Sequence, residues 1–188
     1  NRQNGRRDRA MAALLALAPL LLGAALAIAL ETGLPVLFRQ TRVGLNGREF
    51  GMYKFRSMVK NAAQVGPYFT TDNDPRITRV GRFVRRTSID ELPQLINVLK
   101  GEMSLVGPRP DVPAQRSLYT PVDWAQRCSV RPGITGLAQA LYRSSATEAQ
   151  RLEADLRYVR ECTGFSGFCL DLRIAWLTIQ RLSGKGSN

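Results

Sequence analysis

Residues 11–30 read MAALLALAPLLLGAALAIAL, a stretch that contains no charged side chain. A straight helix of this length reaches about 30 Å, which matches the hydrocarbon core of a bilayer. Pro19 lies near the middle, where a proline removes a backbone donor and kinks a helix. The stretch therefore predicts an apolar helix that meets a membrane and is broken at Pro19.

Arginines flank the apolar stretch on both sides. They are Arg2, Arg6, Arg7 and Arg9 before it, and Arg39, Arg42 and Arg48 after it. Positive charge normally marks the cytoplasmic side of a membrane segment, so matching flanks favour a re-entrant hairpin with both ends cytoplasmic. A spanning helix is the main alternative. A secretory signal is less favoured because no small-residue cleavage site precedes a disulfide-rich domain.

The rest of the chain is predicted to be an α/β domain, mostly helical with a small sheet. Asn46-Gly47 is a strong hairpin-turn signal between two strand-like runs, residues 36–38 and 50–55. Residues 60–75 are predicted to form a polar loop. Apolar residues at helical spacing predict helices at residues 76–86, 92–99, 147–161 and 168–182.

Three of these helices carry more specific predictions. In the first helix one face gathers Ile77, Val80, Phe83 and Val84. In the third helix Glu153 and Arg157 are expected to form an i,i+4 ion pair. The last helix is amphipathic, and Trp176 beside arginine favours a membrane interface over the protein core.

The composition restricts the possible chemistry. The formal charge of +12 predicts a partner that is anionic, such as nucleic acid, a lipid leaflet or a phosphorylated substrate. The absence of histidine excludes Ser-His-Asp triads, Cys-His pairs and HExxH zinc sites. Cys128, Cys162 and Cys169 lack metal-ligand spacing and are expected to be free thiols. Catalysis must then use carboxylates, arginine, lysine, hydroxyls or the backbone.

Asp90 and Glu91 begin the second predicted helix and have two interpretations. Ser88 and Glu91 have the spacing of a capping box, which makes the carboxylates structural. The competing interpretation is a phosphate-handling site. It rests on the neighbouring arginines and on Arg109, which Pro108 and Pro110 hold in a stiff loop. Mg²⁺ commonly binds one or two carboxylates together with phosphate oxygens, which suits phosphoryl transfer.

Six motifs stand in the order seen in one known family. They are Pro35–Gln40 (PVLFRQ), Tyr53–Met58 (YKFRSM), Asn73–Arg82 (NDPRITRVGR), Thr87–Leu95 (TSIDELPQL), Ser104–Pro110 (SLVGPRP) and Val130–Gly136 (VRPGITG). Together they make the chain resemble the bacterial sugar transferases, the monotopic phosphoglycosyl transferases, over roughly residues 10–182. One departure is Ala18, because the family usually has serine before the membrane proline.

The resemblance implies a covalent reaction on Asp90. In it, the Asp of an Asp-Glu dyad attacks the phosphate next to the sugar of a UDP-sugar and expels UMP; polyprenol (undecaprenyl) phosphate then takes the phosphosugar. Glu91 maps to the second dyad member, as a ligand of Mg²⁺ with Asp90 or as a proton acceptor. The family's phosphate-binding positions map to Lys54, Arg85 and Arg109.

The family also implies an organisation and a location. Residues 1–32 are expected to form the basic N-terminus and re-entrant hairpin, and residues 33–188 one catalytic domain with a C-terminal amphipathic helix. The domain is expected on the cytoplasmic face of the bacterial inner membrane, with membrane lipids and a second copy of the chain as further partners. Two rival functions remain, a nucleic-acid-binding membrane protein and a non-enzymatic scaffold for polysaccharide assembly. Nucleic acid is not an expected partner, because no binding motif and no stacking aromatics accompany the arginines.

Overall fold

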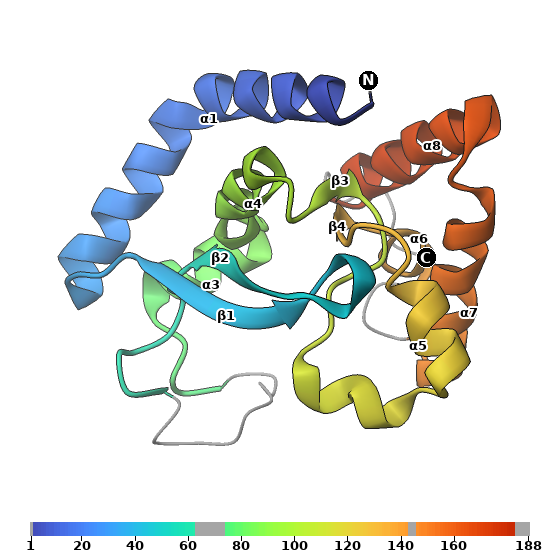
Figure 1. Ribbon diagram of the computed structural model, residues 1–188. Helices are drawn as coiled ribbons and strands as arrows, with labels where there is room; N and C mark the ends of the chain where they lie inside the picture. Colours follow the sequence, from blue (N-terminus) through green and yellow to red (C-terminus); the bar gives the residue numbers. More distant parts are fainter. Residues whose placement is uncertain (1, 63–73, 143–145, 183–188) are drawn as a thin grey trace.

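The computed structural model describes residues 2–62, 74–142 and 146–182 of the chain. It confirms an α/β domain that is mostly helical, with two small sheets in place of the single sheet expected from the sequence (Figure 1). Most of the loop predicted at residues 60–75 lies outside the described residues.

The apolar stretch forms one long helix, α1 (Arg2–Thr32), with Pro19 inside it. The helix changes direction partway along its length, as expected for an internal proline (Figure 1). By length and composition its residues Arg7–Thr32 could cross a membrane, and little of this segment is buried. Leucines on its outer face are exposed, among them Leu15, Leu22, Leu26 and Leu30.

Both halves of α1 pack on the rest of the domain. The first half enters a core cluster through Ala10, Ala13, Leu14 and Leu17, against Phe50, Met52, Leu95, Val98 and Met103. The second half enters another cluster through Leu21, Ala24, Ala25 and Ile28, against Phe55, Val84 and Ile89. Neither half therefore projects away from the domain.

Two strands after α1 form the predicted hairpin. β1 (Leu37–Val43) pairs antiparallel with β2 (Glu49–Phe55), in a register that sets Leu37 opposite Phe55. A short 3₁₀ turn, η1 (Leu45–Gly47), joins them. Asn46 and Gly47 have φ of 55° and 75°, the left-handed conformation that these two residue types tolerate best.

The helices after the hairpin form as three short elements. They are α3 (Arg79–Arg86), η2 (Ile89–Gln94, a 3₁₀ helix) and α4 (Leu95–Lys100). Of the apolar residues expected on one face of this helix, Val84 is buried whereas Phe83 is 60% exposed. The second predicted helix is divided because Pro93 lies inside its first turns, where it donates no backbone hydrogen bond.

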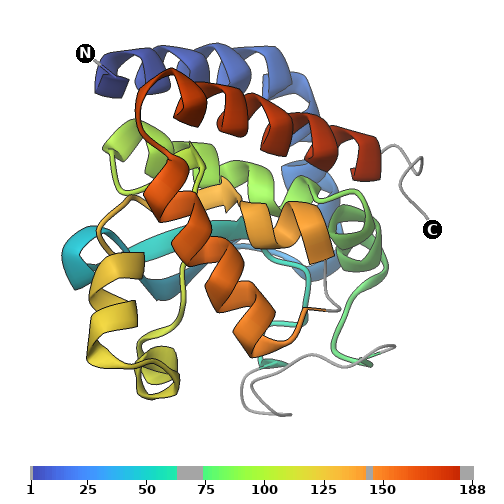
Figure 2. The same cartoon turned by 90° about the vertical axis from the view of Figure 1, so that its right-hand side faces the viewer.

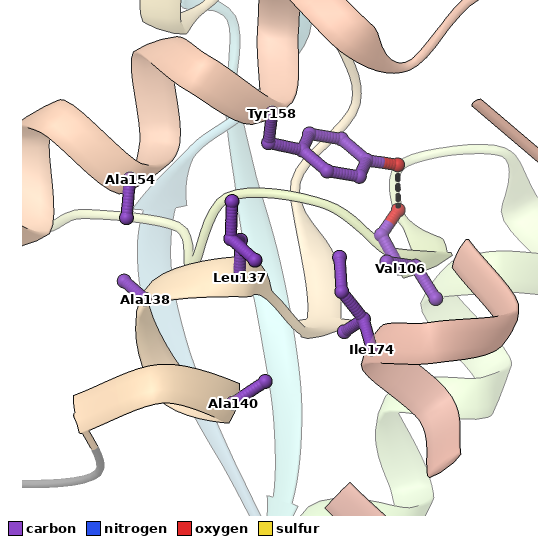
Figure 3. Close-up of a cluster of buried hydrophobic side chains, with 7 residues drawn as sticks. All are labelled: Val106, Leu137, Ala138, Ala140, Ala154, Tyr158 and Ile174. Carbon is purple, nitrogen blue, oxygen red and sulfur yellow. Dashed lines mark hydrogen bonds between the residues drawn. The ribbon is translucent and has the colours of Figure 1, made fainter. Parts of the chain in front are cut away.

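A second sheet and further helices complete the domain. β3 (Ser104–Val106) pairs parallel with β4 (Gly133–Thr135). Around them lie η3 (Pro113–Leu118), α5 (Pro121–Arg127), α6 (Leu137–Tyr142) and α7 (Glu148–Glu161). A buried cluster joins β3, α6, α7 and α8 through Val106, Leu137, Ala138, Ala140, Ala154, Tyr158 and Ile174 (Figure 3). On α7 the ion pair forms between Arg157 and Glu161, not between Arg157 and the predicted Glu153.

The last helix, α8 (Gly164–Leu182), is apolar on two faces. Ile174 is fully buried, with Leu170 and Leu177 packed in the same cluster. The opposite face exposes Phe168, Leu172, Trp176 and Ile179. α8 lies at the same end of the molecule as the first half of α1 (Figure 2), and both helices carry exposed apolar side chains. The three cysteines are free thiols, as expected.

Candidate active site

Glu91 is held between two cations that come from separate parts of the chain. Its Oε1 accepts hydrogen bonds from Lys54 Nζ on β2 at 2.8 Å and from Arg109 Nη2 after β3 at 2.7 Å. Arg109 Nη1 lies 3.5 Å from Oε2, so its guanidinium approaches both carboxylate oxygens. The structure therefore joins three of the predicted site residues in one ion-pair network.

Asp90, the adjacent residue, is 8% exposed. Its carboxylate lies close enough to Lys54, Arg85 and Arg109 for each of these charges to lower its pKa. Within the described residues no donor forms a hydrogen bond to the Asp90 side chain. Asp90 thus presents a carboxylate surrounded by positive charge and still available for reaction.

The position of Lys54 follows from how β2 is attached to α4. One edge of β2 pairs with β1, and the other edge binds Asn97, which is fully buried. Asn97 Oδ1 accepts from Tyr53 N at 3.0 Å, and its Nδ2 donates to Gly51 O at 2.9 Å. One side chain therefore replaces part of a third strand and sets β2 beside the dyad. Nothing in the sequence separates Asn97 from an ordinary polar residue, and it was not predicted.

The backbone before the dyad contradicts the capping-box interpretation. Ser88 is in the left-handed region with φ 57°, and its side chain caps no backbone amide. A residue other than glycine in this region costs of order 1 kcal/mol or more. The Glu91 side chain points to Lys54 and Arg109 instead of returning to the N-terminus of the helix. The first-turn carboxylates therefore make contacts across the fold that a cap does not require.

Arg85 is the arginine of α3 that belongs to the site. Its Nε donates to Ser57 Oγ at 2.9 Å, and its charge lowers the pKa of Asp90. Arg79, Arg82 and Arg86 are exposed, and Arg76 pairs with Asp74 at 2.6 Å. Of the arginines that were predicted to form an anion-binding face, Arg85 is therefore the one that lies near the dyad. It is also the one that the family resemblance marks as a phosphate-binding residue.

Arg109 lies in a loop that packs backbone against backbone on the segment before β4. A Cβ on Gly107 would lie 2.5 Å from Arg131 O, and one on Gly133 would lie 2.1 Å from Gly107 N. No side chain other than hydrogen fits at such distances, so both positions require glycine. The two motifs, SLVGPRP and VRPGITG, therefore meet as one unit that carries Arg109.

The ionisation of the dyad follows from burial and neighbouring charges. Burial raises the pKa of Glu91, but Arg109 and Lys54 outweigh it and lower that pKa to about 2. Burial raises the pKa of Asp90, the charge of Glu91 adds to this, and Lys54 and Arg85 oppose it. Burial lowers the pKa of Lys54, the charge of Glu91 opposes this, and the charge of Arg109 adds to it. Glu91 is thus a permanent anion, whereas Asp90 is the more basic carboxylate.

The donor set can accommodate Mg²⁺ only with help from a substrate. Within the described residues no group of three acidic or thiol side chains converges. In the described part of the chain, the Asp90 carboxylate has no donor and Glu91 Oε2 has only the long contact to Arg109. Two carboxylates fit a magnesium ion whose other ligands are phosphate oxygens and water.

These features define a class of site. Two adjacent carboxylates lie among Lys54, Arg85 and Arg109, so three cations exceed two anions and favour a diphosphate. The site lies in a domain whose longest helix exposes an apolar face. Such a constellation suits phosphoryl transfer at a membrane surface.

The chain belongs to the bacterial sugar transferase family, whose model matches residues 8–185. An undecaprenyl-phosphate glucose phosphotransferase of Komagataeibacter xylinus is 47% identical over 181 residues, covering 89% of this chain and 33% of that protein. A UDP-glucose:undecaprenyl-phosphate glucose-1-phosphate transferase of Escherichia coli is 43% identical, covering 88% and 36%. The chain thus spans about a third of the length of these relatives. The exopolysaccharide production protein PSS of Rhizobium leguminosarum is 44% identical, covering 94% of this chain and 92% of that protein.

Proposed function

We propose that this chain transfers a sugar 1-phosphate from a UDP-sugar to polyprenol (undecaprenyl) phosphate and so initiates a membrane-bound glycoconjugate or exopolysaccharide. The observation that carries the proposal is the pair Asp90 and Glu91. Glu91 is neutralised by Lys54 and Arg109, and Asp90 has no donor among the residues that the structure describes. The relatives of Komagataeibacter xylinus and Escherichia coli are named as undecaprenyl-phosphate sugar phosphotransferases, which supports the same substrates.

In the first step an oxygen of Asp90 attacks the phosphorus next to the sugar. The new O–P bond forms as the bond from that phosphorus to the bridging oxygen breaks, and UMP leaves with the bond's electron pair. A buried, more basic carboxylate is the better nucleophile of the two, because Glu91 is already committed to two cations. Lys54, Arg85 and Arg109 neutralise the diphosphate, which otherwise repels a carboxylate.

In the second step an oxygen of polyprenol phosphate attacks the same phosphorus and releases the Asp90 carboxylate. The product is a polyprenol diphosphate sugar. This acceptor keeps its tail in lipid, so its phosphate reaches the enzyme at headgroup depth. The exposed apolar faces of α1 and α8 support a domain that rests on the cytoplasmic face of the bacterial inner membrane.

Asp90 and Glu91 would hold Mg²⁺ together with substrate phosphate oxygens. The ion, when bound, supplies charge neutralisation to the phosphates. Glu91 orients Lys54 and Arg109 in either case, because both cations meet on one of its oxygens.

The test uses purified chain in nanodiscs with a panel of UDP-sugars. UMP should appear in stoichiometric amount without acceptor and catalytically with undecaprenyl phosphate. Intact mass should show a sugar-phosphate adduct before acceptor is added. UDP-glucose and UDP-N-acetylgalactosamine are the first sugars to try, since relatives at 47% and 44% identity are named for glucose and N-acetylgalactosamine. Absence of UMP with every sugar would contradict the proposal.

The rival functions make opposite predictions for the same sample. A nucleic-acid-binding protein would bind oligonucleotides with a strong salt dependence and release no UMP. A scaffold would be inactive alone and would bind other assembly proteins. A homodimer is a further prediction, and the mass of the protein in nanodiscs would test it.

A further inference from the structure

The loop that carries Arg109 is held through its carbonyl oxygens. Pro108 and Pro110 have no backbone N–H, so the loop can donate few hydrogen bonds of its own. Four consecutive carbonyls accept instead. Their donors are Gly133 N to Pro108, Arg127 Nη2 to Arg109, Arg42 Nη1 to Pro110 and Val43 N to Asp111. Two of these donors are backbone groups of neighbouring strands, and two are arginine side chains from other parts of the chain.

Arg127 is the buried one of these two arginines. It is 4% exposed and forms ion pairs with Asp111 at 2.7 Å and with Asp155 at 2.9 Å. Its guanidinium also lies over the Tyr119 ring, 5.5 Å from the centroid. Burying three charged groups is costly. A protein in which apolar residues of similar volume replace such a network is often no less stable. The stability of the fold alone is therefore a weak reason for this network.

α7 brings a second support to the same loop. Asp155 and Tyr158 are three residues apart and thus lie on one face of the helix. Tyr158 Oη lies 3.2 Å from Val106 O, at the end of β3 immediately before the loop (Figure 3), and 2.8 Å from Asp171 Oδ1, so its single proton is shared between two acceptors. Asp155 accepts a hydrogen bond from Arg127, which in turn donates to the carbonyl oxygen of Arg109 in the same loop. One helix face thereby fixes the loop at two points that flank its first proline.

We propose that Arg127, oriented by Asp111 and Asp155, is a positioning residue that fixes the backbone of Arg109 so that its guanidinium meets Glu91 and the substrate phosphates. The contact is to the carbonyl oxygen of Arg109 itself, and the Arg109 side chain reaches Glu91 at 2.7 Å. Arg127 touches neither substrate nor the dyad. The inference rests on the proposed function for its kinetic test and on geometry alone for its structural test.

The kinetic test is a double-mutant cycle on UMP release. Arg127→Lys keeps the charge but loses the planar fork that serves one carbonyl and two carboxylates. A displacement of about 1 Å at a catalytic group can cost about 10²-fold, so we expect kcat for UMP release to fall by about 10- to 100-fold. KM for the UDP-sugar should change less. In an Arg109→Lys background, the same Arg127→Lys change should cost less than about 3-fold, because coupled residues are not additive.

The matched control is Arg157→Lys. Arg157 also donates from Nε to a carboxylate, that of Glu161 at 2.9 Å, and its side chain is exposed on α7. Its effect on kcat should be small and should be the same in both backgrounds. Melting temperatures of all variants separate a loss of folded protein from a loss of rate.

The structural test does not require activity. The Nε–H proton of Arg109 should exchange with water faster in Arg127→Lys than in the wild type, as measured by NMR on the full chain in detergent or nanodiscs. Arg157→Lys should leave that exchange rate unchanged. Equal costs of Arg127→Lys in both backgrounds, or an unchanged exchange rate at Arg109, would overturn the inference. Absent UMP release by the wild type would instead contradict the proposed function, and the exchange measurement would still decide the role of Arg127.

Discussion

Replacing Asp90 with asparagine separates the chemical role of this carboxylate from any structural role. The amide has nearly the same shape but cannot form the acyl-phosphate bond that the proposed reaction needs. Loss of a covalent nucleophile alone commonly removes most of the catalytic power of a site. We expect UMP release to fall by at least about 10³-fold, equivalent to about 4 kcal/mol of activation free energy.

The stability of Asp90→Asn should change little, because two contributions of opposite sign offset each other. Losing a first-turn carboxylate costs roughly 0.3–1 kcal/mol of helix-dipole stabilisation. The other contribution has the opposite sign. Burial raises the pKa of Asp90 above 3.8, so the ionised group destabilises the folded state at pH 7 and a neutral amide removes that cost. The net change in unfolding free energy should therefore lie within about 1 kcal/mol of zero, a shift in melting temperature of about 4 °C or less.

The assay combines three measurements on the same preparation. UMP release gives the rate, intact mass reports the covalent adduct, and equilibrium binding of the UDP-sugar reports the ground state. Binding measured without Mg²⁺ should be as tight as in the wild type or tighter, because the Asp90 carboxylate repels the phosphates. Asp123→Asn is the matched control, since Asp123 is also a first-turn carboxylate, on α5. It should leave all three readouts near wild type.

Two results would refute this account of Asp90. Retention of more than a few per cent of the rate would remove Asp90 as the nucleophile. A loss of stability of more than about 1 kcal/mol, with activity reduced only in proportion to the folded fraction, would restore the capping interpretation.

Three further predictions follow from the site, the ion-pair network and the long helix. Excess EDTA should stop UMP release and added Mg²⁺ should restore it, because Asp90 and Glu91 otherwise face two phosphates; full activity in EDTA would exclude the metal. Burial raises the pKa of Asp155 to about 6, so its proton is bound more tightly in the folded state and stability should rise as pH falls from 7 toward 5; Asp155→Asn should abolish that rise in melting temperature. Single cysteines at Arg7 and Arg48, which are both exposed, should resist an impermeant thiol reagent in intact cells when the native cysteines are replaced; labelling at position 7 alone would indicate a spanning helix.

The parts of the fold that the sequence predicted well depend on local signals. Asn46-Gly47 predicted the β1–β2 hairpin because only a few residue types accept positive φ. Pro19 predicted a bend within α1 for an equally local reason. Phe83 shows what a local signal leaves open. Its helical spacing placed it on one face with Val84, but packing buries Val84 and leaves Phe83 exposed, and this depends on which elements surround α3.

The sequence predicted which residues belong to the site, but it did not predict how these residues contact one another. Asp90, Glu91, Lys54 and Arg109 came from motifs, and the structure brings them together through contacts between residues 18 to 37 positions apart. Arg42 entered the sequence analysis only as a charge that flanks the membrane segment, yet it donates to Pro110 O. The sequence around an arginine does not reveal such a contact, because its partner is defined only when distant segments of the chain meet.

The packing of α1 connects the membrane segment to the chemistry. A straight helix of the 31 residues in α1 would be about 46 Å long, longer than a domain of this size is wide. The bend instead lets the first half cover the cluster with Leu95 and the second half cover the cluster with Ile89. Ile89 directly precedes Asp90, so the apolar helix packs against the residue next to the proposed nucleophile. An enzyme whose acceptor phosphate stays at headgroup depth needs its nucleophile at that depth, and contact between α1 and the dyad segment supplies a physical means of holding it there.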